Sequence, residues 1–156
     1  MSRRGQAPKR VIAADSRYND VNVSRFINHL MLGGKRSLAE RIVYGAIDLA
    51  EERSRRNGLE VFEQALRNAT PMVEVRPRRV GGATYQVPME IRADRRNSLA
   101  MRWLIRSART RNGRSMVEKL AGELQDTASG QSATTRRKDE TFRMAEANKA
   151  FAHYRW

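Results

Sequence analysis

Three amphipathic helices are predicted in the first half of the chain, where apolar residues recur at every third or fourth position. The first apolar stripe runs from Val23 to Met31 and is stopped by Gly33-Gly34. The second runs from Ala39 to Ala50, and Asn57-Gly58 offers that helix a left-handed exit. The third, from Phe62 to Ala69, is closed by a proline. Three helices are therefore expected before any strand.

Between Met72 and Ile91 the apolar period changes to two, which predicts a β-hairpin at about residues 72–91. Apolar and polar residues alternate on both sides of a Gly81-Gly82 turn. Pro77 and Pro88 lie inside the two arms, and proline cannot donate to a strand ladder, so neither arm should be central in a larger sheet. We therefore expect a free two-stranded ribbon whose tip is ordered by a partner.

Helical periodicity then returns and predicts three more helices. The first spans about residues 95–111 with Trp103 facing inward, so Trp103→Ala is expected to unfold the domain. Ser115 and Glu118 predict a capping box for the second helix. The third spans about residues 135–152. Its predicted core residues are Phe142, Ala145 and Phe151. The expected fold class is mainly α: six helices, a projecting two-stranded β-hairpin and a basic N-terminal arm.

The charge of the chain is strongly unbalanced, with 31 Lys and Arg against 17 Asp and Glu, a formal net charge of +14. Such a surplus requires a polyanion, either nucleic acid or an anionic membrane surface. No stretch approaches the roughly 20 apolar residues of a spanning helix, and no apolar run follows the basic N-terminus to make a signal peptide. We therefore expect a nucleic-acid partner in the cytoplasm and no membrane partner.

Residues 1–14 are predicted to form a basic, flexible arm, and residues 15–156 a single helical RNA-binding domain. The arm contains Gly5 and Pro8 and has no acidic residue. A solvated tail without function is the alternative, but the charge of the whole chain favours RNA contact. The candidate RNA-binding residues of the arm are Arg3, Arg4, Lys9 and Arg10.

Further candidate RNA-binding residues lie on the hairpin and on the helix after it. Four arginines spaced by seven, four and three fall within a narrow arc of that helix: Arg95, Arg102, Arg106 and Arg109. Such like charges repel each other, so either an anion lies along this row or acidic residues elsewhere in the fold pair with it. The hairpin and the segment after it add Arg76, Arg78, Arg79, Tyr85, Arg92 and Arg96. Guanidinium groups bind phosphates bidentately and stack on bases, whereas a charged, protected sheet edge is the alternative.

The chain shows no side-chain set typical of an enzyme, such as a nucleophile with a base, or metal ligands. It has no cysteine and only two histidines, so we expect no metal and no cofactor. Residues 33–37 resemble the end of a phosphate-binding loop, but His29 occupies the position of its first glycine and Arg36 the position of its Ser or Thr. A nucleotide loop is thus excluded. Lys35 and Arg36 remain candidates for binding an RNA phosphate.

Four motifs together resemble one protein family. They are Gly34-Lys35-Arg36 followed by Ile42-Val43-Tyr44, the hairpin from Val73 to Pro88, the segment from Arg95 to Trp103, and the ending from Arg143 to Trp156. In this order, and over the whole chain, they resemble the bacterial and plastid small-subunit ribosomal protein family numbered seven. One departure is Gly33, where relatives often have an acidic residue.

The resemblance implies a bundle of six helices that binds the 3′ major domain of the small-subunit ribosomal RNA and nucleates assembly of the subunit head. It implies a position near exit-site tRNA and the messenger channel, with the small-subunit protein numbered eleven as a neighbour. It adds Arg136 and Arg137, at the start of the last helix, to the RNA-binding positions. The implied location is a ribosome, in the bacterial cytoplasm or the chloroplast.

Three other functions remain open. A basic scaffold that compacts DNA would need the same net charge, and the resemblance adds a repressor that binds its own messenger, since some relatives act in this way. A basic ribonuclease represents the enzymes. Competition between folded ribosomal RNA and duplex DNA distinguishes the DNA-compacting scaffold from the ribosomal interpretation. Incubation with labelled RNA tests for a ribonuclease.

Overall fold

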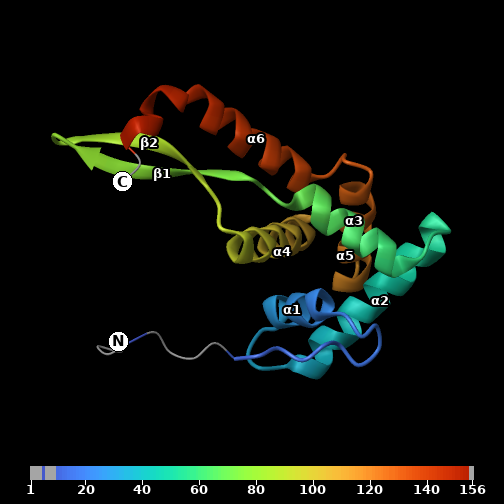
Figure 1. The fold of residues 1–156 in the computed structure, drawn as a ribbon. Coiled ribbons are helices and arrows are strands. Elements are labelled where there is room, and N and C mark those ends of the chain that lie inside the picture. Colours follow the sequence, from blue (N-terminus) through green and yellow to red (C-terminus); the bar gives the residue numbers. More distant parts are fainter. Residues whose placement is uncertain (1–4, 6–9, 155–156) are drawn as a thin grey trace.

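The computed structural model describes residue 5 and residues 10–154. Over these residues the chain forms six α-helices, one antiparallel hairpin and a closing 3-10 helix (Figure 1). In chain order the elements are α1 (Val21–Leu30), α2 (Arg36–Ser54), α3 (Gly58–Ala69), β1 (Val73–Val80), β2 (Ala83–Glu90), α4 (Ala93–Thr110), α5 (Met116–Ala128), α6 (Ala133–Ala147) and η1 (Lys149–Tyr154). The predicted fold class, mainly α with a two-stranded hairpin, is confirmed.

Helix α5 lies at the centre of the helical part and contacts α2, α3, α4 and α6. The core around it includes an edge-to-face pair, Phe26 of α1 and Phe62 of α3, with ring centroids 5.3 Å apart. Burying side chains of this size contributes roughly 1.5–3 kcal/mol each, so the amphipathic stripes of the sequence provide most of the driving force for folding. The hairpin and α6 project together from this core (Figure 1).

The connection between α2 and α3 differs from the prediction. Arg55, with φ of 53°, is the left-handed residue that ends α2, and the predicted exit at Asn57-Gly58 is wrong. The Asn57 side chain instead caps α3 by accepting from the backbone N–H groups of Leu59 and Glu60. A Cβ at Gly58 would lie 2.7 Å from the carbonyl oxygen of Ile47. The glycine is therefore required by the close approach of α2 and α3 rather than by a turn.

The capping box also occurs at a different helix. At α5, Ser115 accepts from the N–H of Glu118, but the Glu118 carboxylate accepts from Arg114 instead of closing the reciprocal bond with Ser115. The reciprocal pair is found at α6, between Ser132 and Thr135. Only half of the predicted box is thus confirmed, because the glutamate side chain reaches one residue further back.

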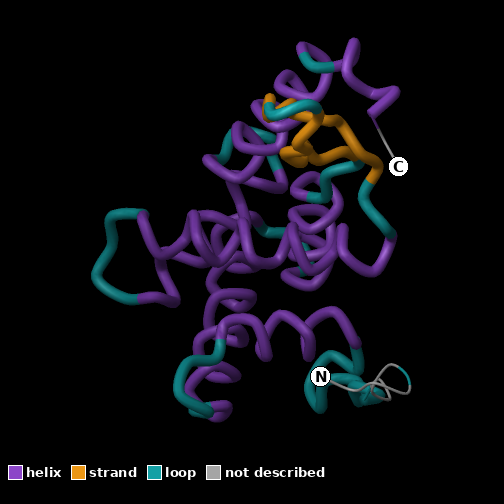
Figure 2. Tube along the Cα trace, turned by 90° about the vertical axis from the view of Figure 1, so that its left-hand side faces the viewer, coloured by secondary structure: helices purple, strands orange, loops and turns teal. Residues whose placement is uncertain are grey.

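The C-terminal helix is shorter than predicted. Helix α6 ends at Ala147, and after Asn148 the chain tightens into η1. Phe142 is 53% exposed, so its predicted place in the core is wrong, whereas Ala145 is buried. Only a narrow stripe of α6 faces protein, because the helix lies along the hairpin and the edge of the core rather than between other helices (Figures 1 and 2).

The hairpin register runs from Val73 opposite Glu90 to Val80 opposite Ala83, and no third strand joins it within the described part of the chain. The ribbon is nevertheless not free as predicted. The centroid of the Tyr85 ring lies 5.1 Å from that of the Phe151 ring and 5.2 Å from that of the Tyr154 ring, and both of these residues belong to η1. Because a two-stranded hairpin alone is marginally stable in water, these aromatic contacts support β2 from the C-terminal side.

Trp103 is only half-buried, which corrects its predicted place in the core. Its ring contacts α6, with the Arg137 guanidinium carbon 5.8 Å from the ring centroid. The inner face of α4 is formed instead by residues such as Met101 and Ile105.

We expect Trp103→Ala to leave the chain folded and to lower its free energy of unfolding by about 1.5–2.5 kcal/mol, less than full burial would give. Thermal melting beside Phe142→Ala, an exposed aromatic control, measures this; complete unfolding of the variant would contradict it.

Asp15 connects the N-terminal segment to α2. Its buried carboxylate accepts from the Tyr44 hydroxyl at 2.7 Å and from the backbone N–H groups of Arg17 and Tyr18. Burial by itself would raise the pKa of Asp15, but these hydrogen bonds lower it below the ordinary value of 3.8. The segment after the arm is thus fixed to the helical core by a carboxylate that stays charged.

We expect the Asp15 network to make the fold sensitive to acid. Since the folded pKa lies below the unfolded one, the charged carboxylate stabilises the fold above pH 4 or so, and this contribution is lost as the pH falls through the folded value. Asp15→Asn should lower stability at pH 7 by about 1–3 kcal/mol and flatten its pH dependence below pH 5. Urea unfolding from pH 3 to 7 tests this; parallel curves for the two proteins would count against it.

Candidate nucleic-acid interface

Four predicted arginines come together in one open hollow of about 690 Å³ between the base of the hairpin, α1 and α4. Arg76 comes from β1, Arg92 directly precedes α4, and Arg95 and Arg102 come from the first half of α4. They meet because β2 leads directly into α4, which turns back beneath the hairpin (Figure 1). The hollow also has two acidic side chains, Glu90 and Asp94, so cations outnumber anions two to one in its lining.

Glu74 holds two of these arginines in place. Its carboxylate accepts from Arg76 Nε at 2.6 Å and forms an ion pair with Arg95 Nη2 at 3.1 Å. Burial by itself would raise the pKa of Glu74, but the hydrogen bonds from Arg95 and Arg76 lower it below its ordinary value. One carboxylate between two guanidinium groups leaves one positive charge uncompensated, and it fixes where that charge lies.

The arginine row of α4 is mostly without acidic partners. Arg95 is paired with Glu74, so for this arginine the alternative of pairing with an acidic residue of the fold holds. Among the described residues, however, Arg102, Arg106 and Arg109 form no ion pair. Arg102 donates to the Ser98 carbonyl, and Arg109 donates to the Leu30 carbonyl at 3.2 Å. These neutral acceptors orient the guanidinium groups without cancelling their charge.

Arg96 has a structural role in the described fold. Its Nε donates to the Ile91 carbonyl and its Nη2 pairs with Glu90, both at 2.7 Å, and the side chain is largely buried. It therefore closes the junction between β2 and α4. Arg92, the residue before α4, is exposed at the edge of the hollow.

The hairpin arginines point to both faces of the ribbon. Side chains alternate along a strand, so Arg76 and Arg78 share one face and Arg79 lies on the other, opposite Thr84. Tyr85 is the cross-strand partner of Arg78 and packs against η1, so its ring is already covered on one side. A nucleic-acid groove that receives the ribbon would meet cations on both of its faces.

The remaining candidates lie outside the hollow. Lys35 and Arg36 are exposed where the Gly33-Gly34 turn enters α2, and Arg36 pairs with Glu40 in the next turn of the helix. Arg136 and Arg137 are exposed in the first turn of α6. Arg10 is exposed before the first helix. The three other basic residues predicted for the arm lie outside the described residues: Arg3, Arg4 and Lys9.

His29 is a part of the hollow that the sequence did not reveal. In the sequence it stands beside the apolar stripe of α1, a position typical of residues at the margin of a core. In the structure its Nε2 lies 3.1 Å from Ser98 Oγ, on the wall of the basic hollow. Burial lowers the pKa of His29, and the positive charge of Arg102 lowers it further, so the ring is neutral at pH 7.

Comparison with known proteins assigns the chain to a family. The family described as ribosomal protein S7p/S5e matches residues 2–149. The chain belongs to this family. The chain is similar to small ribosomal subunit protein uS7 of Chloroflexus aurantiacus, with 61% identity over 99% of this chain and 98% of the relative. It is similar to the uS7 proteins of Syntrophotalea carbinolica, at 60% identity, and Methylobacterium radiotolerans, at 57%, each over the full length of both chains.

Membership of the S7p/S5e family confirms the resemblance that the hairpin and C-terminal motifs indicated. Such identity over the whole length leaves no large insertion in this chain relative to those uS7 proteins. Among the described helices, none is both long and apolar enough to cross a membrane. The basic hollow, the arginine row and the hairpin thus lie on a chain of a ribosomal protein family.

Proposed function

We propose that this S7p/S5e member is a structural component of the small ribosomal subunit that binds the 3′ major domain of the ribosomal RNA and nucleates assembly of the subunit head. Family membership supports the coarser part of this statement, a structural and non-enzymatic ribosomal protein with RNA and protein neighbours. The observation that carries the finer part is the convergence of Arg76, Arg92, Arg95 and Arg102 on one hollow.

The proposed mechanism is the docking of a folded helical core onto an RNA junction. The three unpaired arginines of α4 neutralise phosphates and release counterions, which provides affinity, while the hairpin and the predicted arm (residues 1–14) extend the contact. Specificity comes from the shape of the RNA, because side chains cannot read the deep major groove of an A-form helix. The proposed neighbours are the messenger RNA, exit-site tRNA and the small-subunit protein numbered eleven, in a ribosome of the bacterial cytoplasm.

Filter binding tests this proposal directly. The full chain is titrated into a folded 3′ major-domain RNA and into duplex DNA of equal length, at several salt concentrations. We expect tighter binding to the RNA at each concentration and a steep dependence of affinity on salt. Equal affinity for duplex DNA would favour a DNA-compacting scaffold, and shortening of the labelled RNA during incubation would favour a ribonuclease.

A further inference from the structure

A second hollow, of about 480 Å³, opens where the α1–α2 turn meets the end of α4 and the start of α5. Its floor is apolar: Met31 and Ile42 are half-buried against the core. Two leucines on its walls are exposed, Leu32 at 66% and Leu38 at 47%. Single exposed leucines are common, but these gather with the floor residues into one contiguous apolar surface, which usually marks a binding site.

The charges around this hollow are all of one sign. Lys35 and Arg109 line it, and none of its lining residues is a carboxylate. Within the described chain neither cation forms an ion pair, and Arg109 is held by the neutral carbonyl of Leu30. An apolar cavity bordered only by unpaired cations is complementary to a ligand with an apolar face and negatively charged ends.

We propose that this hollow receives one unstacked base of the bound RNA, with the phosphates on either side of that base at Lys35 and Arg109. This inference rests on the proposed RNA-binding function and locates part of it. An apolar segment of a neighbouring protein would also fit the leucines, but it would leave the two cations without partners unless it were acidic. Ribonucleotides provide both properties in each residue, and proteins recognise RNA in this way where bases are splayed out of the helix.

The position of the hollow is consistent with the same RNA strand reaching it. Arg109 continues the α4 row that begins at the basic hollow, and Lys35 follows the Gly33-Gly34 turn. Both glycines have positive φ, and a Cβ at either would meet nothing within 4 Å, so the turn is open to solvent on its outer side. An RNA strand that follows the α4 arginines therefore arrives at the apolar floor, where a base can be buried between side chains.

The test is Leu38→Ala in the full chain, with Leu32→Ala as a second variant in case the first perturbs α2. Binding to the folded 3′ major-domain RNA should weaken about three- to tenfold, since part of a leucine contact is lost. The dependence of affinity on salt should not change, because no counterion is released at an apolar contact. Lys35→Gln should instead lower the salt slope by about 0.7–0.9. Phe142→Ala changes an apolar residue on α6 whose exposure lies between those of the two leucines, so it is the matched control and should bind like the parent.

Photocrosslinking identifies the occupant. A benzophenone amino acid at position 38 should attach to a nucleotide when the complex with RNA alone is irradiated. Parent-like affinity of both leucine variants, or crosslinks that reach only protein in assembled subunits, would overturn the inference while leaving the proposed function intact. Absence of RNA binding by the parent chain would overturn both, so the two failures are distinguishable.

Discussion

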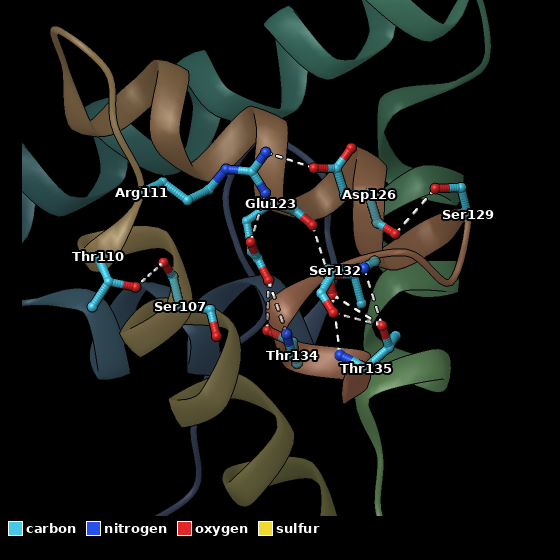
Figure 3. A network of polar contacts seen from close by, with 10 residues as sticks. Ser107, Thr110, Arg111, Glu123, Asp126, Ser129, Ser132, Thr134 and Thr135 are labelled. Carbon is cyan, nitrogen blue, oxygen red and sulfur yellow. Dashed lines mark hydrogen bonds and ion pairs between the residues drawn. The ribbon is translucent and has the colours of Figure 1, made fainter. Parts of the chain in front are cut away.

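Arg111→Ala is expected to lower the free energy of unfolding by about 3 kcal/mol, the largest effect on stability that we predict for a single residue of this chain. Arg111 joins the end of α4 to α5 through Glu123, at 2.7 Å, and through Asp126 (Figure 3). The Glu123 carboxylate is fully buried and also accepts from the backbone N–H and the hydroxyl of Thr134. Without Arg111 it becomes a buried charge that has lost its counterion, which typically costs 3–5 kcal/mol.

We place the expected loss at the lower end of that range because a third of the Arg111 side chain is exposed, so water can partly replace it. In a chain of this size such a loss lowers the melting temperature by about 6–12 °C. Arg67→Ala is the control, because Arg67 forms an exposed pair with Glu63 within one helix and should change stability by less than about 0.5 kcal/mol. Equal melting temperatures for the two variants would show that the buried network contributes little.

A second variant distinguishes loss of the pair from loss of the charge. Arg111→Leu combined with Glu123→Leu removes both ions and keeps apolar volume at the junction, so it should be less destabilising than Arg111→Ala alone. The surroundings of the pair are tight: a Cβ at Gly122 would lie 3.3 Å from Arg111 Nη2. The guanidinium therefore packs across the backbone of α5 as well as pairing with its carboxylates.

The sequence predicts the secondary structure well, because each helix of the core buries one apolar stripe and the hairpin alternates at period two. The prediction from the sequence is wrong where one residue type can have either of two structural roles. Gly58 could end α2 by a left-handed turn or allow α3 to approach Ile47, and only the packing of the two helices decides between these roles. Phe142 and Trp103 are similar cases, because the periodicity of a helix does not tell which part of its apolar face another element covers.

The sequence was sufficient to predict which arginines share a face in the candidate site, but not which of them pair with carboxylates. The spacing of Arg102, Arg106 and Arg109 was sufficient to place them on one face of α4, and the described structure leaves all three without a carboxylate. Glu74 and Arg76 lie two residues apart on one face of β1, but no spacing indicates that Arg95 joins them, because Arg95 is brought there by the turn of the chain from β2 into α4. Ion pairs over such sequence separations depend on the tertiary fold.

Replacing the arginines of the hairpin is expected to weaken RNA binding more than any other change that we predict. Arg76→Ala, Arg78→Ala and Arg79→Ala combined should weaken binding to the 3′ major-domain RNA about a hundredfold at about 0.15 M salt and lower the salt slope by about 2–3, as three phosphate contacts would. These arginines lie on both faces of the ribbon, so replacing all three removes the contact whichever face meets the RNA. The far-ultraviolet circular dichroism should not change, because the aromatic contacts of Tyr85 with η1 remain.

A variant of equal net charge separates contact from long-range attraction. Arg53→Ala, Arg55→Ala and Arg56→Ala combined also remove three exposed cations, all from the end of α2 and its connection to α3, on the opposite side of the molecule from the hairpin (Figure 1). If surplus charge alone attracted the RNA, both triple variants would lose affinity equally, and the hairpin would have no special part in binding. A direct contact requires the salt slope to fall only for the hairpin variant, because counterions are released only where a cation neutralises a phosphate. Equal slopes for the hairpin variant and the parent would exclude these arginines from the interface.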